Sequence, residues 1–139
     1  MAERNQRHAD AARMLELADA AARAEAAAAR RQLDAFVADM TSRGLDPEPL
    51  RATLLSGRRV KTQLLGWYLN KAQTVAVGAD GEFYQLVVPG SPLARFTGVA
   101  PEPAQPVLEI GKGGKDGETG PLGDFLARAL AEYAARHSD

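Results

Sequence analysis

The segment most suggestive of ligand chemistry is a glycine-rich run near the C-terminus, GKGGKDGETG, at residues 111–120. Glycine allows backbone N–H groups to turn toward an anion, and two lysines within the run add positive charge. However, the run lacks the Gly-Lys-Ser/Thr of a nucleotide-binding P-loop, and two acidic residues oppose its lysines. It therefore predicts either a flexible or tightly turned connection, or a small phosphate or nucleotide site at 111–117. The residues of that candidate anion site are Lys112, Gly113, Gly114 and Lys115.

A basic stretch is the second candidate, in which Arg51 is followed by Arg58, Arg59 and Lys61 with no acidic residue between them. Basic side chains bind nucleic acid mainly through its phosphates, and neighbouring aromatic rings can add stacking. These charges are few for such a role, and arginine and lysine are common on any protein surface. The stretch is therefore interpreted either as a solvated connector or as part of a nucleic-acid surface.

Two pairs of neighbouring aromatic residues, Trp67 with Tyr68 and Phe83 with Tyr84, lie in β-rich segments. Successive side chains of a strand point to opposite faces of a sheet, so one ring of each pair should enter the core. The other ring could form an exposed patch for a partner or ligand, with core packing and cross-strand pairing as the alternative. The candidate partner residues in these pairs are Trp67, Tyr68 and Tyr84.

The sequence offers little to catalysis or to metal binding. It contains no cysteine, which excludes disulfide scaffolds, zinc fingers, iron–sulfur clusters and thiol nucleophiles. The two histidines, His8 and His137, lie near opposite ends, where a catalytic base is poorly held. Asp80 and Glu82 are close together, but a hairpin turn accounts for both. We therefore expect no enzyme activity, no metal and no cofactor.

The composition is that of a small globular protein in two parts. Hydrophobic residues make up 45% and charged residues 25% of the chain, and the formal net charge is -1. This balance argues against a strongly basic nucleic-acid binder and against an acidic tail protein. More than half of the alanines fall within the first 46 residues. That break separates an alanine-rich helical or coiled-coil segment at 1–46 from a small α+β domain at 47–139.

The location expected from the sequence is the cytoplasm. The N-terminal sequence MAERNQRHAD is charged and lacks the apolar stretch of a secretory signal. No apolar run approaches the ~20 residues that span a bilayer, so we expect no membrane partner.

The alanine-rich segment predicts one long helix, because residues 9–43 contain no glycine or proline and consist mainly of strong helix formers. At 1.5 Å per residue this helix would be roughly 50 Å long, more than a small core can cover. Its apolar positions lie on one face, mostly as alanine, and become bulky at Leu33, Phe36 and Met40. Those three are the candidate partner face. The helix is either a self-associated or partner-bound coiled coil, or a solvated single helix. In either case its bulky C-terminal end is expected to dock on the globular part.

The remaining segments predict the α+β fold. Asp80-Gly81, between two β-rich runs, is a strong hairpin signal, and the C-terminal helix is amphipathic and should cover one face of the sheet. The expected elements after the long helix are a short second helix at 47–55, a β-meander with antiparallel strands at 64–70, 74–77 and 82–88, short strands at 93–99 and 107–110, and a helix at 121–136.

A resemblance covers most of the chain. An Ala/Arg/Glu-rich helix is followed by RGLDPEPL, GWYLNKAQTVAVGADGEFYQLVVPG and GKGGKDGETGPLGDFLARAL. In that order these segments resemble a group of small uncharacterised proteins from high-GC actinobacteria. The resemblance implies a bacterial cytoplasmic protein and supplies no active site.

These observations favour a non-enzymatic protein-interaction or oligomerisation module, with a protein partner or a second copy bound through the N-terminal helix. Two alternatives remain. One is a nucleic-acid-associated regulator that uses the basic 58–61 stretch with an aromatic sheet face. The other is a phosphate- or nucleotide-binding domain at 111–117.

Overall fold

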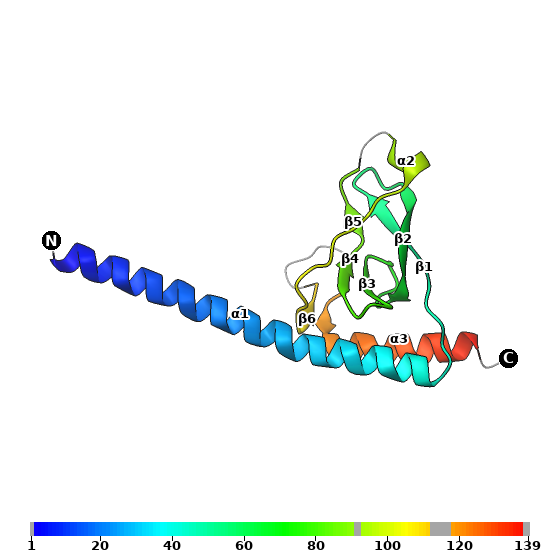
Figure 1. The fold of residues 1–139 in the computed structure, drawn as a ribbon, viewed down its shortest axis with the longest axis horizontal. Coiled ribbons are helices and arrows are strands. Elements are labelled where there is room, and N and C mark those ends of the chain that lie inside the picture. Colours follow the sequence, from blue (N-terminus) through cyan, green and yellow to red (C-terminus); the bar gives the residue numbers. More distant parts are fainter. Residues whose placement is uncertain (1, 91–92, 112–117, 138–139) are drawn as a thin grey trace.

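A computed structural model describes residues 2–90, 93–111 and 118–137 as an α+β fold, in which a small β-sheet rests on two helices that lie side by side (Figure 1). Within this described part, no helix is long and apolar enough to cross a membrane. The elements in chain order are α1 (Ala2–Ser42), β1 (Glu48–Leu54), β2 (Arg59–Tyr68), β3 (Val75–Gly78), β4 (Phe83–Gln85), β5 (Val87–Val88), α2 (Ala94–Thr97), β6 (Glu109–Ile110), β7 (Gly120–Pro121) and α3 (Leu122–Arg136).

The long N-terminal helix predicted from the sequence is confirmed. Helix α1 spans 41 residues, which corresponds to about 60 Å at the α-helical rise. It ends where Gly44 adopts a positive φ of 73°. The N–H of Leu45 donates to the C=O of Met40, and the N–H of Gly44 to the C=O of Thr41. These two bonds form a Schellman cap, the helix end for which glycine is best suited.

The larger sheet contains five strands in the order β4-β3-β2-β1-β5. Strands β1 to β4 pair antiparallel with their neighbours in the chain, whereas β5 pairs parallel with β1. Only Leu86 separates β4 from β5, although these strands form opposite edges of the sheet. The C=O of Leu86 accepts the N–H of Thr53 at 2.6 Å, and its N–H donates to the C=O of Thr74 at 2.7 Å. The sheet therefore curls until its two edges meet.

Two hydrophobic cores form on the two faces of this curled sheet. Because side chains alternate along a strand, Trp67 and Phe83 enter one core and Tyr68 and Tyr84 the other. The inner core, enclosed by the sheet, includes Leu50, Ala52, Leu54, Val60, Tyr68, Ala76, Tyr84, Leu86 and Ala94. The outer core, between the sheet and helices α1 and α3, includes Ala29, Leu33, Phe36, Met40, Trp67, Val77, Phe83, Leu122, Phe125, Ala129 and Tyr133.

The short helix predicted at 47–55 is wrong, because this segment forms strand β1. Leu50, Ala52 and Leu54 are buried on one side of the strand, while Leu55 is 75% exposed. The leucine spacing therefore follows the period of two of a strand. Pro47, a residue type common at the first position of a helix, lies instead just before the strand, where its missing N–H is tolerated.

The predicted meander is correct in direction but differs in extent. The structure adds β1 to make four antiparallel strands, starts β2 at Arg59 instead of residue 64, and divides the last predicted strand into β4 and β5. The predicted strand at 93–99 is wrong, since it contains the one-turn helix α2. The predicted strand near 107–110 exists as β6, which pairs with β7.

The predicted hairpin at Asp80-Gly81 joins β3 to β4. Gly81 has a φ of 83°, and the N–H of Gly78 donates to the C=O of Glu82 at 2.9 Å. The loop thus contains three residues rather than the two expected, with the glycine in the left-handed position. Asp80 holds this turn, because its carboxylate accepts the N–H of Glu82 at 2.9 Å and the O–H of Tyr84 at 2.8 Å.

Helix α3 covers the sheet as predicted and is fastened to it by one buried hydroxyl group. The O–H of Tyr133 donates to Glu48 at 2.5 Å, and the same oxygen accepts the N–H of Tyr68 at 2.9 Å. Arg136 pairs with Glu48 at 3.1 Å. Burial, followed by the hydrogen bond to Glu48, raises the pKa of Tyr133 above its ordinary value. Glu48, the first residue of β1, thus links that strand to α3.

Candidate interaction surfaces

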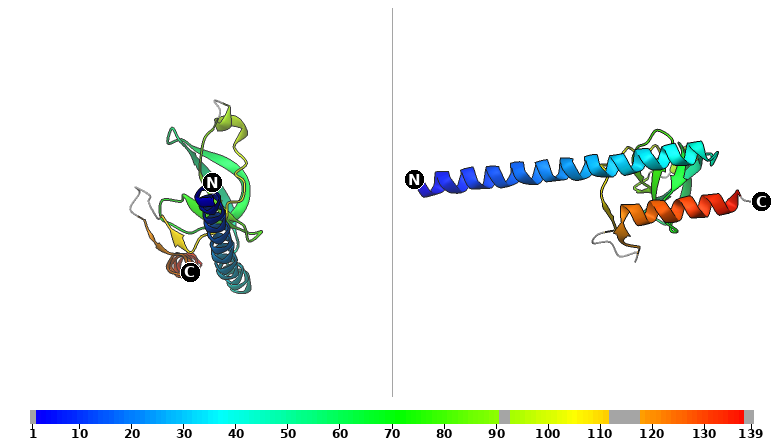
Figure 2. Two further views of the ribbon diagram at one scale, coloured as in Figure 1. Left: turned by 90° about the vertical axis from the view of Figure 1, so that its left-hand side faces the viewer. Right: turned by 90° about the horizontal axis from the view of Figure 1, so that it is seen from below.

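The most prominent surface feature is the N-terminal part of α1, residues 2–25, which we call the arm. Every one of these residues is exposed. Figure 1 and the right-hand view of Figure 2 show the arm projecting well past the sheet and past α3, while the rest of α1 lies beside α3. We call everything from residue 26 onward the body.

The arm continues the face with which α1 contacts the rest of the body. Ala29, Leu33, Phe36 and Met40 are the buried residues of α1, and they recur at spacings of three and four. The same spacing, continued toward the N-terminus, reaches Ala26, Ala22, Ala18 and Leu15. Of these, Leu15 is the largest, and it is 67% exposed. The face that packs in the body is therefore uncovered in the arm.

The arm meets the body at its C-terminal end, where a loop crosses α1. The N–H of Leu108 donates to Glu25 at 3.1 Å, and Gln105 donates to the C=O of Ala22 at 3.3 Å. Further along, Arg30 pairs with Glu82 at 3.3 Å. These polar contacts mark the boundary between the arm and the body.

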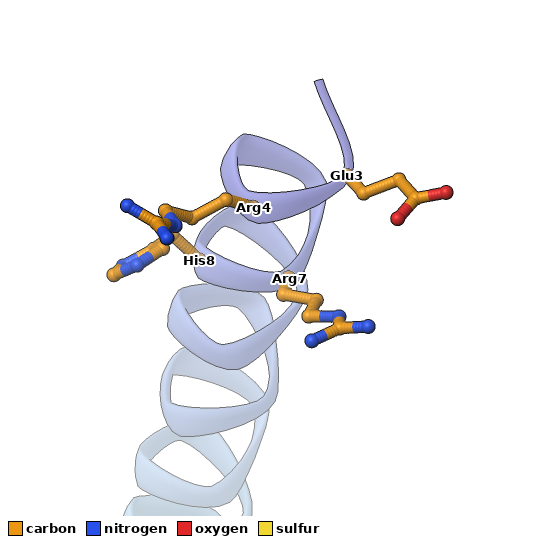
Figure 3. Close-up of a pocket in the computed structure, with 4 residues that line it drawn as sticks. All are labelled: Glu3, Arg4, Arg7 and His8. Atoms are coloured by element: carbon orange, nitrogen blue, oxygen red, sulfur yellow. The ribbon is translucent and has the colours of Figure 1, made fainter. Parts of the chain in front are cut away.

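A surface hollow lies at the N-terminal end of the arm, lined by Glu3, Arg4, Arg7 and His8. Figure 3 shows that all four side chains come from one helix and spread apart. Arg4 and His8 point to one side, whereas Arg7 and Glu3 point elsewhere. The hollow therefore follows the outline of a helix end and lacks the convergent side chains of a ligand site.

The predicted partner face of Leu33, Phe36 and Met40 is covered by the chain's own body. Leu33 and Met40 are 0% exposed and Phe36 is 6% exposed. The ring of Phe36 meets that of Trp67 edge-on, with centroids 6.0 Å apart. These residues hold α1 on the sheet, so the docking of the bulky end is confirmed and the three side chains are not accessible to an outside partner.

The exposed aromatic patch expected from alternation is absent, because Trp67, Tyr68 and Tyr84 are all buried among the described residues. Trp67 donates from its indole N–H to the C=O of Leu45 at 3.1 Å. The hydroxyl of Tyr68 accepts the N–H of Arg51 at 2.8 Å. Burial, then the hydrogen bond to Asp80 and nearby negative charge, raise the pKa of Tyr84 to about 12. The interpretation of these rings as core residues is therefore the correct one, because both faces of the sheet are covered.

The basic stretch lies on the hairpin of β1 and β2 rather than in a connector. Arg58 is in the turn, and Arg59 and Lys61 are exposed residues of β2. Arg51, on β1, is directly opposite Lys61 in the strand register. The hairpin therefore brings Arg51 to Lys61. That pairing was hidden from the sequence because residues 47–55 were expected to be helical.

The predicted anion site falls outside the described residues, because Lys112, Gly113, Gly114 and Lys115 belong to 112–117. At its C-terminal flank, Glu118 accepts the N–H of Ala72 at 3.2 Å through Oε1, while its buried Oε2 has no hydrogen-bond partner. Glu118 borders a small hollow that also contains Asn70. Asn70 accepts the N–H groups of Thr74 and Val75 and so organises the β2–β3 turn. A local turn asparagine of this kind gave no distinct signal in the sequence.

Within the described residues, no three His, Asp or Glu side chains gather closely enough to hold a metal ion. Within the described part of the chain, two surfaces remain as candidates for binding: the arm and the basic hairpin. No family model matches the chain, and no curated protein or solved structure matches it significantly.

Proposed function

We propose that this chain is a non-enzymatic interaction module whose arm pairs with the arm of a second copy. The observation that carries the proposal is the full exposure of residues 2–25 on a helix whose core-facing side continues into the arm. In the body that side is covered by the sheet and α3. In the arm nothing among the described residues covers Leu15 or Ala18. Apolar surface of this kind is stabilised when another helix removes it from water.

The composition of the arm suits a helix as its partner. Ala11, Ala18 and Ala22 carry short side chains, so a second helix can approach the backbone closely. The acidic residues Asp10 and Glu16 lie away from this face, where they stay in water, and Asp19 borders it. A second copy presents the same patch and can form a closed two-fold interface.

The length of the arm also fits a pair of copies. Residues 2–25 extend about 36 Å at 1.5 Å per residue. Two arms that overlap antiparallel place the bodies at opposite ends, away from each other. Because alanine buries little area, the pairing should be reversible, with Leu15 as its largest apolar contact.

Sedimentation equilibrium over a wide concentration range tests the proposal with a matched pair of variants. Leu15→Glu places a charge on the core-facing side of the arm, whereas Leu17→Glu places it on the far side. The two leucines are similarly exposed, at 67% and 61%. Both variants should therefore keep the stability of the parent. We expect the parent and Leu17→Glu to dimerise with rising concentration, and Leu15→Glu to remain monomeric.

Two results would contradict the proposal. One is a parent protein that stays monomeric at every concentration. The other is a dimer that Leu15→Glu and Leu17→Glu weaken equally. Equal effects on opposite sides of the helix would mean that the dimer interface is not the core-facing side.

A further inference from the structure

The outward side of the β1–β2 hairpin concentrates positive charge. Strand alternation sends Leu50, Ala52 and Val60 inward, and leaves Arg51, Arg59 and Lys61 exposed on the other side. Arg51 lies opposite Lys61, and Thr53 opposite Arg59, in the antiparallel register. We call the surface formed by Arg51, Arg59 and Lys61 the basic hairpin face.

Like charges directly opposite each other across two strands oppose strand pairing. The ion pairs among the described residues involve Arg30, Arg43 and Arg136, and none involves a residue of the basic hairpin face. Arg59 donates a hydrogen bond to the hydroxyl of Tyr68 at 3.4 Å, which holds the guanidinium near Arg51 without neutralising it. The face therefore keeps three uncompensated cations close together.

The stretch of sequence that contains the basic hairpin face also lacks acidic residues. Residues 49–79 contain five basic residues and no acidic one, in a chain whose formal net charge is -1. The acidic residues belong mainly to α1 and to the segments around α3. This stretch of the sheet therefore carries basic residues with no acidic residue among them, and an anion that approaches the hairpin meets no carboxylate from that stretch.

We propose that the basic hairpin face docks on the phosphate backbone of a double-stranded nucleic acid. Phosphate contacts need only positioned cations and no base readout, which fits a face of arginine and lysine. Single strands are usually held by aromatic stacking. Here Trp67, Tyr68 and Tyr84 are buried, and Phe96 of the neighbouring helix α2 is the one exposed aromatic ring among the described residues. A single ring offers no row of stacking positions, so this surface favours the duplex.

The row of cations follows the strands along the side of the sheet, with polar Thr53 and Gln63 beside it. A membrane-binding surface instead combines basic residues with large apolar side chains that enter the lipid. Exposed apolar side chains do lie near the face, among them Leu55 at the hairpin turn and Val87 of β5, which is paired with Thr53. An anionic membrane is therefore the competing partner that the experiment must distinguish.

The experiment measures binding of the full chain to a labelled 20-base-pair DNA duplex by fluorescence anisotropy at several salt concentrations. Three phosphate contacts give a log–log salt slope of about −2.7, which corresponds to roughly 40-fold weaker binding at 200 mM than at 50 mM salt. The double variant Arg51→Gln with Lys61→Gln should lose about two units of that slope. Glutamine keeps the Cβ and Cγ groups, so an unchanged melting temperature should verify the fold.

Arg13→Gln with Arg23→Gln is the matched control, because it changes the net charge equally at exposed positions of the arm. The proposal expects this control to bind the duplex like the parent, and expects a single strand of equal length to bind no more tightly than the duplex. Equal losses in both double variants would overturn it, as would a salt slope near zero. Binding to vesicles containing phosphatidylserine, with no binding to the duplex, would overturn it in favour of a membrane surface.

Discussion

The two parts of α1 have similar compositions but different surroundings. Residues 2–25 are exposed throughout, whereas from Ala29 to Met40 every third or fourth residue is buried. Both parts are rich in alanine and charged residues, but only the second carries Leu33, Phe36 and Met40 on its inner side. The difference shows that helix formation and burial are separate properties of this sequence. The bulky residues, rather than the helical pattern, decide where the body begins.

The arm is helical without a tertiary partner because the body removes the cost of starting the helix. Nucleating an isolated helix is unfavourable, while each further residue adds one hydrogen bond. The packed part of α1 supplies the nucleus, and alanine, the strongest helix former, extends it. A side-chain hydrogen bond from Gln6 to Asp10 at 3.1 Å adds local support. The arm is therefore expected to fray from its free end.

The largest difference between the two parts should appear when the same leucine is truncated in each. Leu33 is 0% exposed and Leu15 is 67% exposed. Leu33→Ala should lower the free energy of unfolding by about 2–5 kcal/mol, because it removes buried methyl groups and leaves a cavity. Leu15→Ala should change it by no more than about 0.5 kcal/mol. Urea denaturation at a low protein concentration measures both; similar losses would mean that the arm belongs to the folded core.

Alkaline pH should destabilise the body and leave the arm untouched. Burial, together with its bond to Asp80, raises the pKa of Tyr84 from 10.0 to about 12. The folded state therefore favours the protonated hydroxyl, a stabilisation that is complete below pH 10 and is lost as pH rises toward 12. Because the bond between Tyr84 and Asp80 is only partly buried, solvent screening limits this stabilisation to less than the roughly 2–3 kcal/mol that the full shift would give.

Residues 2–25 contain no tyrosine or lysine, so no side chain of the arm titrates in this range. Denaturation midpoints measured between pH 9 and pH 11.5 should fall for the parent and fall less for Tyr84→Phe. An equal decline in both proteins would show that Tyr84 is not a source of the pH dependence.

The β3–β4 turn contacts the body part of α1, since a Cβ built on Gly81 would lie 3.2 Å from Asp34. Gly81 has a φ of 83°, which a β-branched residue adopts only with strain. Gly81→Val should therefore cost about 1–2 kcal/mol of unfolding free energy. Asp80→Asn should cost less, because asparagine retains one oxygen acceptor and tolerates the turn. A valine variant as stable as the parent would contradict the turn geometry.

The smallest global effect is expected from glycine in the arm. Ala18→Gly should weaken the helix locally by about 1 kcal/mol, without changing the denaturation midpoint of the body. Hydrogen exchange of the amides on the N-terminal side of Ala18 should become faster. A shift in the midpoint of the whole protein would instead indicate that the arm and the body unfold together.

Local signals made part of this fold predictable from the sequence. The long helix, its end at Gly44, the turn at Gly81 and helix α3 each depend on residues close in the chain. Strand β1 was not predictable in this way, because Leu50 and Leu54 fit the period of a helix as well as that of a strand. Pairing with β2 makes this segment a strand, and that pairing depends on tertiary structure.

For the candidate surfaces, too, the features that depend on local sequence were predictable and those that depend on tertiary structure were not. The exposure of the arm could be foreseen, because a helix of this length exceeds a small core. The burial of Tyr68 and Tyr84 could not, because it depends on the sheet curling at Leu86 to enclose an inner core. Arg51 was likewise missed as a partner of Lys61, since cross-strand neighbours are defined only once the register is known.

The most direct test of the arm as an exposed pairing helix is residue-resolved hydrogen exchange on the parent protein, at concentrations well below and well above the dimer midpoint. We expect the amides of residues 5–21 to exchange quickly in the dilute sample and to become protected in the concentrated one. The amides of residues 29–42 should be protected equally in both. The account would be contradicted if the amides of the arm were as protected as those of the body in the dilute sample. It would also be contradicted if the exchange rates of the arm did not change with protein concentration.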